Sequence, residues 1–193
     1  ITGFQEFWSL MFQIDNGVLI PRPETECLVE QSLELLKDRL HQPLRILDIG
    51  CGSGILAIVF AKEFSKGIIH AIDISERALK NAEINAHLHG VASQITFFKS
   101  DLFSEFSSDR KFDLIVSNPP YITEKQWERL DPQIRDYEPK EALVGGKEGI
   151  DFHLRILKES PRVLNKGGYI IMEMAPDQGG ILKDSLAEFK NFS

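Results

Sequence analysis

The sequence predicts an α/β fold with a doubly wound, mainly parallel sheet. Short apolar runs alternate with segments of helical period from residue 44 onward, and several of these runs end in Gly, Asp or Asn-Pro. Strands that alternate with helices in this way form parallel sheets with helices on both faces. The composition agrees, because 42% of the 193 residues are hydrophobic and 26% are charged, as in one domain with a substantial core.

The first 23 residues are expected to form a linker and a β-hairpin ahead of the main domain. Asp15-Asn16-Gly17 lies between the apolar runs 12–14 and 18–20. Asn-Gly between two such runs is a strong signal for a hairpin turn, because both residues accept positive φ angles. The sequence therefore predicts that residues 12–14 pair with residues 18–20.

The main domain, residues 24–193, is predicted to begin with a helix at Glu24 or Thr25, after the stiff segment Pro21-Arg22-Pro23. The strands are expected at residues 44–49, 68–72, 95–98, 112–117 and 169–174. The later helices are expected at residues 55–64, 76–88, 150–164 and 179–189, with Ser75 as an N-cap, Gly90 as a helix end and a loop over 132–144. Because the chain stops after a helix, where such a sheet would normally add another strand, we expect missing strands at the C-terminus. We also expect a missing segment at the N-terminus.

The net charge of −7 and the lack of a Lys/Arg block argue against stable binding to a nucleic-acid backbone. The sequence has no run of about 18 apolar residues, so we expect no membrane span. Cys27 and Cys51 are too few for a disulfide framework, and no histidine stands near them at metal-ligand spacing, so we expect no metal site. The small number of cysteines indicates a reducing compartment, and we expect the chain to be a monomer.

A glycine-rich turn, Gly50-Cys51-Gly52-Ser53-Gly54, joins the first strand of the main domain to its helix. Glycines allow a tight turn and close approach of a ligand to the backbone, and the helix start beyond offers free N–H groups. A turn that binds no ligand remains an alternative. Cys51 is read as a small filler rather than a nucleophile, because no base is near it in the sequence.

Two aspartates follow the next two strands. Asp73 lies about 20 residues after the glycine turn, the spacing of an acid that binds both ribose hydroxyls. Its alternative role is an N-cap, for which Ser75 competes. Asp101 ends the third strand and is a candidate acceptor for the exocyclic amine of an adenine, or else a solvated loop acid.

Asn118-Pro119-Pro120-Tyr121 directly follows the apolar strand 112–117. Two prolines stiffen the turn and remove backbone donors, so that the acceptors that remain are the Asn118 side-chain oxygen and main-chain carbonyls. Such a turn is suited to holding a planar NH2 group. The predicted strand order reverses between the first and fourth strands, which brings this motif to the same edge as the glycine turn and both aspartates. A rigid turn without a ligand is the alternative.

The glycine turn with the preceding Asp48, together with Asp73 and residues 118–121, resembles the class I S-adenosylmethionine-dependent methyltransferases that act on planar nitrogen. These enzymes have a Rossmann-like fold. The resemblance narrows with Pro21-Arg22-Pro23-Glu24-Thr25-Glu26, Glu138-Pro139 and Ala142-Leu143. These segments are similar to the bacterial and organellar protein-(glutamine-N5) methyltransferases of peptide chain release factors, over roughly residues 17–178.

The resemblance implies methyl transfer to the glutamine of the Gly-Gly-Gln loop in class I release factors, which are then the protein partners. It implies S-adenosylmethionine as donor, bound by Gly50, Cys51, Gly52, Ser53, Gly54, Asp73, Asp101, Leu102 and Asn118. Asn118, Pro119, Pro120 and Tyr121 are the implied substrate-binding residues, with Asn118, Pro119 and Tyr121 in the catalytic set. It also implies an N-terminal helical domain that this sequence does not contain, and a location in the bacterial cytoplasm or, in a eukaryote, in an organelle.

Two positions depart from the family pattern. Leu102 stands where many relatives have an aromatic residue, so adenine packing is expected to involve Phe103 or its neighbours. The segment 173–178 lacks the usual glycine, which leaves Gln178 without an assigned role. Three alternatives stay open: an adenine-N6 DNA methyltransferase, a glutamine methyltransferase of a ribosomal protein, and a protein that binds the donor without methyl transfer.

Overall fold

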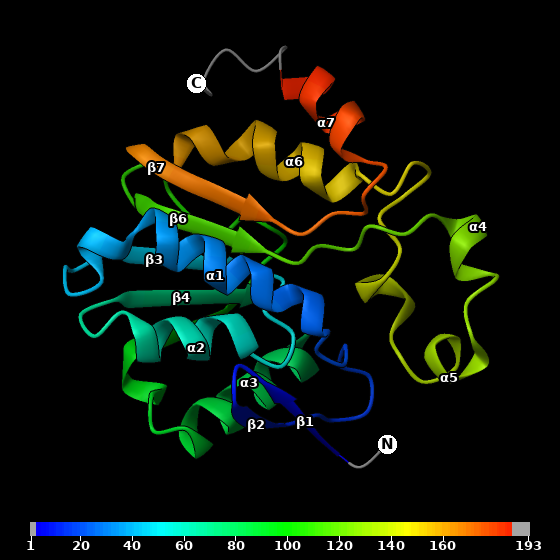
Figure 1. Ribbon diagram of the computed structural model, residues 1–193, viewed down its shortest axis with the longest axis horizontal. Helices are drawn as coiled ribbons and strands as arrows, with labels where there is room; N and C mark the ends of the chain where they lie inside the picture. The colour runs from blue at the N-terminus through cyan, green and yellow to red at the C-terminus, as the bar shows by residue number, and fades with distance from the viewer. Residues whose placement is uncertain (1–2, 187–193) are drawn as a thin grey trace.

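A parallel sheet of five strands, in the order β5-β4-β3-β6-β7, forms the centre of the computed structural model, which describes residues 3–186 (Figure 1). Its strands are β3 (Arg45–Ile49), β4 (Ile68–Asp73), β5 (Ile95–Lys99), β6 (Phe112–Ser117) and β7 (Leu164–Met172). The predicted fold class and strand order are confirmed. The order reverses between β3 and β6, so the carboxyl ends of these two strands flank a crevice where ligands bind in such sheets.

The helices cover both faces of the sheet. They are α1 (Glu26–Leu35), α2 (Ile55–Glu63), α3 (Glu76–Leu88), α6 (Asp151–Glu159) and α7 (Gly179–Leu186), with the short α4 (Glu124–Trp127) and α5 (Pro132–Arg135). Short 3₁₀ turns occur at η1 (Pro23–Thr25), η2 (Lys37–Arg39), η3 (Ala92–Gln94), η4 (Lys140–Ala142) and η5 (Ser160–Arg162). Successive residues of β3 point to opposite faces of the sheet. Ile46 packs with α1, α2 and α3 on one face, whereas Leu47 packs with α6 on the other.

The predicted hairpin is wrong in its position. The strands that pair are β1 (Phe4–Phe7) and β2 (Leu10–Gln13), and their turn is Trp8-Ser9, with φ of 52° and 57°. Tertiary contacts stabilise this left-handed turn without glycine: the Trp8 backbone N–H and indole N–H donate to the carboxylates of Glu26 and Glu63, at 2.7 and 3.0 Å. The Asp15-Asn16-Gly17 segment is a turn that leads out of β2.

Buried amides fasten β2 to the main domain. Asn85 of α3 accepts from the Gln13 N–H at 2.8 Å and donates to the Gln13 and Ser53 carbonyls. Asn81, one turn earlier, donates to the same Gln13 carbonyl and accepts from the Asp15 N–H. The hairpin is therefore held against the helix that follows β4, next to the glycine turn.

Most other predictions were correct within a few residues. The helix at 76–88 and the strand at 112–117 match, and Ser75 caps α3 by accepting from the Ala78 N–H at 3.3 Å. β7 begins five residues earlier than predicted, with a register irregularity opposite Phe112 and Leu114. The predicted loop 132–144 contains α5 and η4. The last three residues of the predicted helix 179–189 lie outside the described residues.

No helix among residues 3–186 combines the length and apolar character needed to cross a membrane.

Candidate functional site

A cavity of about 530 Å³ lies at the carboxyl ends of β3, β4 and β6, where the strand order reverses. Its walls come from the strand ends, from α6 and from the segment that follows the hairpin. The residues that line it include Gly17, Leu19, Gly50, Gly52, Asp73, Asp101, Leu102, Asn118, Pro119, Pro120, Ala142 and Phe152. Four sequence segments that were predicted to meet at one edge are thus brought together.

The glycine turn divides into two parts with different surroundings. Gly50 and Gly52 line the cavity at φ of 70° and 55°, and a Cβ at either position would meet no atom within 4 Å. Their missing side chains leave a backbone cradle open toward a ligand. Gly54 instead faces α3, where a Cβ would lie 2.9 Å from that of Ala82. Gly54 therefore permits close packing of α2 against α3.

Cys51 and Ser53 are buried within the turn and do not line the cavity. Burial raises the pKa of the Cys51 thiol well above its usual value, which leaves it protonated and unreactive. This environment agrees with a filler role for the side chain. The Ser53 carbonyl accepts the hydrogen bond from Asn85, so that this part of the turn is connected to α3.

Asp48 lies fully buried at the base of the glycine turn. Its Oδ2 accepts from the Ala57 N–H of α2 at 3.1 Å, whereas Oδ1 has no partner among the described residues. Burial raises the pKa of Asp48 to about 7, and the nearby charge of Asp73 acts in the same direction. A neutral carboxylic acid is therefore present in part of the molecules near neutral pH.

Asp73 is held in place by the backbone around it. Its Oδ2 accepts from the Gly52 N–H at 2.9 Å, and its Oδ1 accepts from the Ser75 N–H at 2.8 Å. Burial raises its pKa, although these hydrogen bonds oppose the change. Each carboxylate oxygen keeps a second lone pair, so the carboxylate remains able to accept hydroxyl hydrogen bonds from the cavity side.

Asp101 and Leu102 form the part of the cavity wall next to Asp73, because the Ser100 N–H donates to the Asp73 carbonyl at 3.0 Å. Asp101 is exposed, and its two oxygens lie 3.0 and 3.1 Å from the Arg155 guanidinium of α6. Leu102 is buried and has a φ of 49°, which is unusual for a residue with a Cβ. Of Phe103 and its neighbours, which were expected to contribute to adenine packing, Leu102 lines the cavity, whereas Phe103 is fully buried away from it with its ring facing Arg162. The aromatic side chain in the cavity wall is Phe152.

Asn118 and Pro119 lie between this cavity and a second one of about 160 Å³. The smaller cavity is lined by Leu19, Arg22, Asn118, Pro119, Tyr121, Ile122, Leu130, Ile134, Ala142 and Leu143. Pro120 lines only the larger cavity and Tyr121 only the smaller one. The Asn-Pro-Pro-Tyr turn therefore separates two chambers, and its first two residues reach both.

A hydrogen-bonded network that no local pattern predicted supports the turn. Asn118 Nδ2 donates to Thr25 Oγ1 at 3.0 Å, and Thr25 Oγ1 donates to Glu173 Oε2 at 2.7 Å. The Tyr121 hydroxyl donates to the other oxygen of Glu173 at 3.0 Å. Thr25 is fully buried and Glu173 directly follows β7. The only indication of this network in the sequence was that Thr25 belongs to the segment 21–26, which carries the family resemblance.

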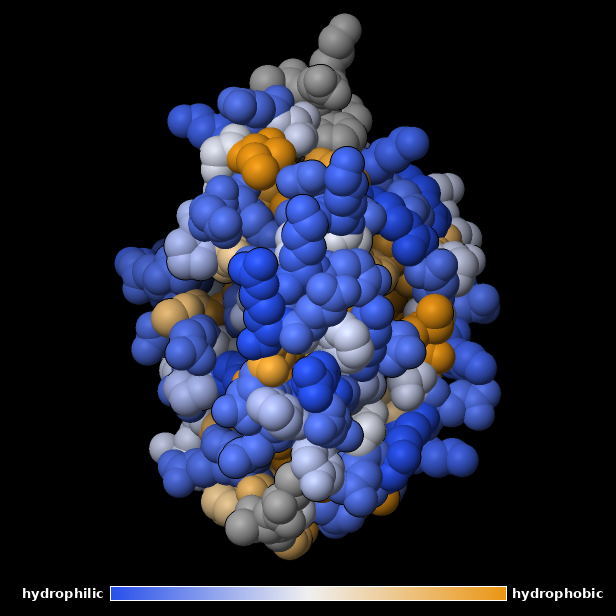
Figure 2. Space-filling model, turned by 90° about the vertical axis from the view of Figure 1, so that its right-hand side faces the viewer, coloured by the Kyte–Doolittle hydropathy of each residue, from blue (hydrophilic) through white to orange (hydrophobic). Residues whose placement is uncertain are grey.

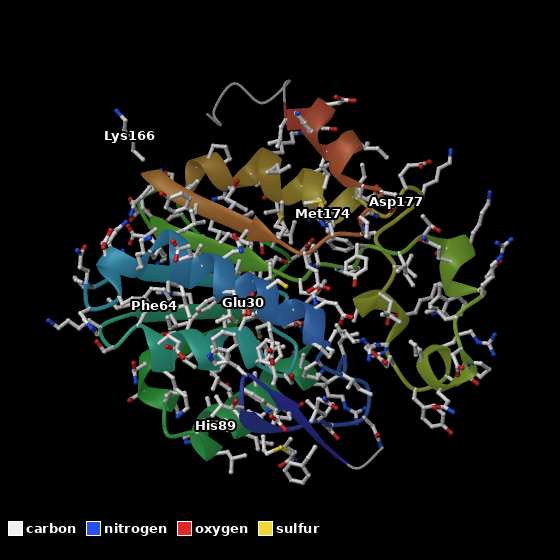
Figure 3. All side chains as sticks on the ribbon, in the orientation of Figure 1. Glu30, Phe64, His89, Lys166, Met174 and Asp177 are labelled. Atoms are coloured by element: carbon white, nitrogen blue, oxygen red, sulfur yellow. The ribbon has the colours of Figure 1, made fainter. Side chains whose placement is uncertain are left out.

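The side-chain amide of Gln178 holds the Asn-Pro-Pro-Tyr turn in place. Its Nε2 donates to the carbonyls of Tyr121 and Gly149 at 2.7 and 3.1 Å, while its Oε1 accepts from the Ala175 N–H at 3.0 Å. Gly145 and Gly149 lie so close to Pro120 and Tyr121 that a Cβ at either glycine would overlap a main-chain oxygen. Gln178, whose role the sequence left unassigned, is thus a buried structural link. The segment that contains it and Asp177 runs from β7 toward α7 (Figure 3).

The side of the molecule that carries α4 and α5 is mainly hydrophilic, with hydrophobic side chains in small separate areas (Figure 2). This is the side toward which the carboxyl ends of the sheet strands point (Figure 1). Among the described residues, no group of three His, Cys, Asp or Glu side chains is arranged to hold a metal ion.

Comparison with protein families gives a match to the model described as "Methyltransferase small domain" over residues 27–131. A release factor glutamine methyltransferase from Rhodopirellula baltica is 40% identical over 190 residues, covering 97% of this chain and 64% of that protein. A protein of the same name from Koribacter versatilis is 39% identical, covering 100% of this chain and 67% of that protein. The chain thus spans about two thirds of the length of these curated relatives.

Among solved structures, a ribosomal protein L11 methylase from Lactobacillus delbrueckii subsp. bulgaricus superposes with a TM-score of 0.64. The two are 27% identical, and the match covers 91% of this chain and 72% of that one.

Proposed function

Because this chain belongs to the methyltransferase small domain family and, within it, to the release factor glutamine methyltransferases, we propose that it methylates a protein glutamine. The donor is S-adenosylmethionine, and the acceptor is the side-chain amide nitrogen of the glutamine in the Gly-Gly-Gln loop of class I release factors. The reaction belongs to the compartment in which these factors act, the bacterial cytoplasm or a eukaryotic organelle. Residues 24–193 are the methyltransferase domain, and residues 1–23 are the linker and hairpin that lead into it.

The observation that supports this function best is the position of Asn118 and Pro119 in the walls of both cavities. A transfer reaction needs two ligands that meet at one point. A donor in the larger cavity and a side chain that enters through the smaller one would meet at these two residues. The Asn118 oxygen is free for this purpose, since no described residue donates a hydrogen bond to it.

The larger cavity is suited to the donor in size and in chemistry. Gly50 and Gly52 offer bare backbone to the methionine part, with Cys51, Ser53 and Gly54 shaping the turn behind them. Asp73 offers carboxylate oxygens to the ribose hydroxyls. Asp101 and Leu102 flank the adenine, with the Phe152 ring in the same wall. When bound, S-adenosylmethionine supplies a methyl group that is already activated by its sulfonium charge, and it leaves as S-adenosylhomocysteine once the methyl–sulfur bond is broken.

The protein's own contribution is to position a weak nucleophile. Asn118 Oδ1 and the Pro119 carbonyl each accept one N–H of the substrate amide, which fixes the plane of the NH2 group. Tyr121 borders the entering side chain in the smaller cavity, whereas Pro120 lines the larger cavity on the donor side. Holding two reactants in a fixed alignment lowers the activation free energy by several kcal/mol. Acceptors directed at the positive charge that develops on nitrogen lower it further by electrostatic stabilisation. The amide nitrogen becomes acidic as it is alkylated and then releases one proton to water, so no strong base is required beforehand.

Radioactive methyl transfer tests the substrate. The protein is incubated with labelled S-adenosylmethionine and, in separate reactions, with a class I release factor, its Gln→Ala loop variant, ribosomal protein L11 and duplex DNA. We expect label on the wild-type release factor alone. Label on DNA or on L11 would replace this proposal with one of the alternative methyltransferase functions, and donor binding without transfer to any acceptor would indicate a binding protein.

Asn118→Ala tests the role of the amide. We expect turnover to fall by about a hundred-fold or more, because positioning at the reacting nitrogen is lost, while the affinity for S-adenosylmethionine changes little. Asp73→Ala is the matched variant, in which we expect the affinity for S-adenosylmethionine to fall more than turnover. Equal losses of turnover and donor affinity in Asn118→Ala, measured by single-turnover kinetics and calorimetry, would contradict this assignment.

A further inference from the structure

We propose that Glu173 is a positioning residue that sets the orientation of the Asn118 amide through the hydroxyl of Thr25. The three residues come from segments far apart in the sequence: the end of η1, the residue after β6 and the residue after β7. Their contacts form a continuous path, 2.7 Å from Thr25 Oγ1 to Glu173 Oε2 and 3.0 Å from Asn118 Nδ2 to Thr25 Oγ1. This inference rests on the proposed function, in which the Asn118 oxygen faces the substrate amide.

The direction of each hydrogen bond follows from the chemistry of the groups. A carboxylate only accepts, so the single hydroxyl hydrogen of Thr25 is directed at Glu173. The Thr25 oxygen is then available only as an acceptor, and the group of Asn118 that faces it must be the NH2. If the amide were turned by 180°, two oxygens would face each other and the hydrogen bond would be lost. Glu173 thereby selects the rotamer in which Asn118 Oδ1 is left for the substrate.

The position of Glu173 is itself well defined. Its backbone N–H donates to the Ser117 carbonyl at 3.0 Å, directly before Asn118, and its own carbonyl lies 2.7 Å from Nε2 of the buried His153. Its second carboxylate oxygen accepts from the Tyr121 hydroxyl. Burial and the Glu173 charge raise the pKa of Tyr121 to about 12, so this hydroxyl remains a donor. Both carboxylate oxygens are therefore occupied by donors.

Because Thr25 is buried, its hydroxyl can form hydrogen bonds only with the protein groups around it. Its side chain is inaccessible to solvent, so that no water competes for its hydroxyl, and it makes no N-cap hydrogen bond although it precedes α1. A threonine at a helix start usually accepts from the backbone two or three residues later. Here the hydroxyl serves the path from Glu173 to Asn118 instead.

Substitutions that keep the shape but change the hydrogen bonds test the inference. Thr25→Val removes the hydroxyl, Thr25→Ser keeps it, and Glu173→Met removes the acceptor at similar volume. Glu34→Gln on the exposed face of α1 is the control. We expect Thr25→Val and Glu173→Met to lower kcat for release-factor methylation by about ten-fold or more, with the Kd of S-adenosylmethionine within about two-fold of wild type. Thr25→Ser should recover most of the rate.

A double variant separates positioning from general support. If Glu173 acts through Thr25, adding Glu173→Met to the Thr25→Val protein should lower kcat by less than about three-fold, because the path of hydrogen bonds is already interrupted. Full additivity of the two losses would overturn the inference. So would a Thr25→Val protein that keeps the wild-type kcat, or a folded Thr25→Ser protein that is as slow as Thr25→Val.

An NMR measurement tests the amide orientation independently of the substrate. In the wild-type protein, the side-chain NH2 of ¹⁵N-labelled Asn118 should show a nuclear Overhauser effect to the Thr25 methyl group. This signal should weaken in Glu173→Met, in which the amide is free to turn. If the wild-type protein shows it but does not methylate a release factor, the proposed function fails and the orientation stands. An unchanged signal in Glu173→Met overturns the role of Glu173, whatever the substrate.

Discussion

Glu138 and Arg22 form an ion pair with 2.6 Å between Oε1 and the guanidinium, and the Glu138 side chain is almost entirely buried. Its other oxygen lies 3.4 Å from the Ile20 N–H. The pair joins the segment before α1 to the segment after α5, two parts of the chain that both line the cavities beside Asn118. A single carboxylate thus connects both segments at the site.

Removal of Arg22 should leave Glu138 buried without a counter-charge. Because Arg22 is partly exposed, we expect Arg22→Ala to lower the free energy of unfolding by about 1–3 kcal/mol. The double substitution Arg22→Met with Glu138→Leu should recover much of this loss, since no charge is then buried. Urea unfolding of the single and double variants measures both effects.

The exposed pair Lys37–Glu34 provides the control, because Lys37→Ala should produce no measurable change in stability. If Arg22→Ala were as stable as Lys37→Ala, the ion pair would have no structural role.

Gly52 and Gly54 should respond differently to alanine. Both have positive φ, which costs about 1–2 kcal/mol in a residue with a Cβ. Only Gly54→Ala also places a methyl group against Ala82, which should add about 1–3 kcal/mol by overpacking. Gly52→Ala should keep most of the stability but lose donor affinity, because its methyl group projects into the cavity.

Thermal unfolding and calorimetric titration with S-adenosylmethionine measure the two effects. Ala82→Gly should partly restore the stability of Gly54→Ala and should leave Gly52→Ala unchanged. Equal destabilisation of the two glycine variants would contradict the division of the turn into a ligand side and a packing side.

Local patterns predicted the sheet and much of its edge. The strand 112–117 is a continuous apolar run that ends in Asn-Pro, and α3 has a serine cap and a terminal glycine, so each boundary has a nearby chemical cause. Parallel strands expose their carboxyl ends on one side. Gly50, Asp73, Asp101 and Asn118 could therefore be brought together from strand order alone.

Contacts between distant segments were beyond such reasoning. The turn at Trp8-Ser9 has no glycine and depends on Glu26 and Glu63, so Asn16-Gly17 was the stronger local signal at the wrong place. The link between Thr25 and Glu173 joins residues 148 positions apart. No periodicity or spacing reports a hydrogen bond of that kind.

Gln178 should be more important for stability than its position after β7 suggests. Gln178→Glu directs a carboxylate at the carbonyls of Tyr121 and Gly149, and we expect a loss of about 2–4 kcal/mol from buried groups left without donors. Hydrogen exchange should become faster in the segment around Tyr121. The same change at the exposed Gln133 is the control, and comparable losses at both positions would contradict the structural role of Gln178.

The buried Asp48 should make stability depend on pH. Its pKa is raised from 3.8 to about 7 in the folded protein, so the folded state holds a proton that the unfolded state releases between these values. The resulting stabilisation is complete below about pH 4 and is lost as the pH rises through 7. Asp48→Asn replaces the acid with a neutral amide that still accepts from the Ala57 N–H.

Urea unfolding at several pH values between 4 and 8 isolates this contribution. The stability of the wild type minus that of Asp48→Asn should decrease as the pH rises, by up to about 4 kcal/mol over the whole interval. Groups that titrate in both proteins cancel in this difference, so the slope belongs to Asp48 and to its coupling with Asp73. A difference that stays constant from pH 4 to 8 would mean that Asp48 is ionised in the folded protein. The Oδ1 atom, which lacks a partner among the described residues, would then need a donor such as a buried water.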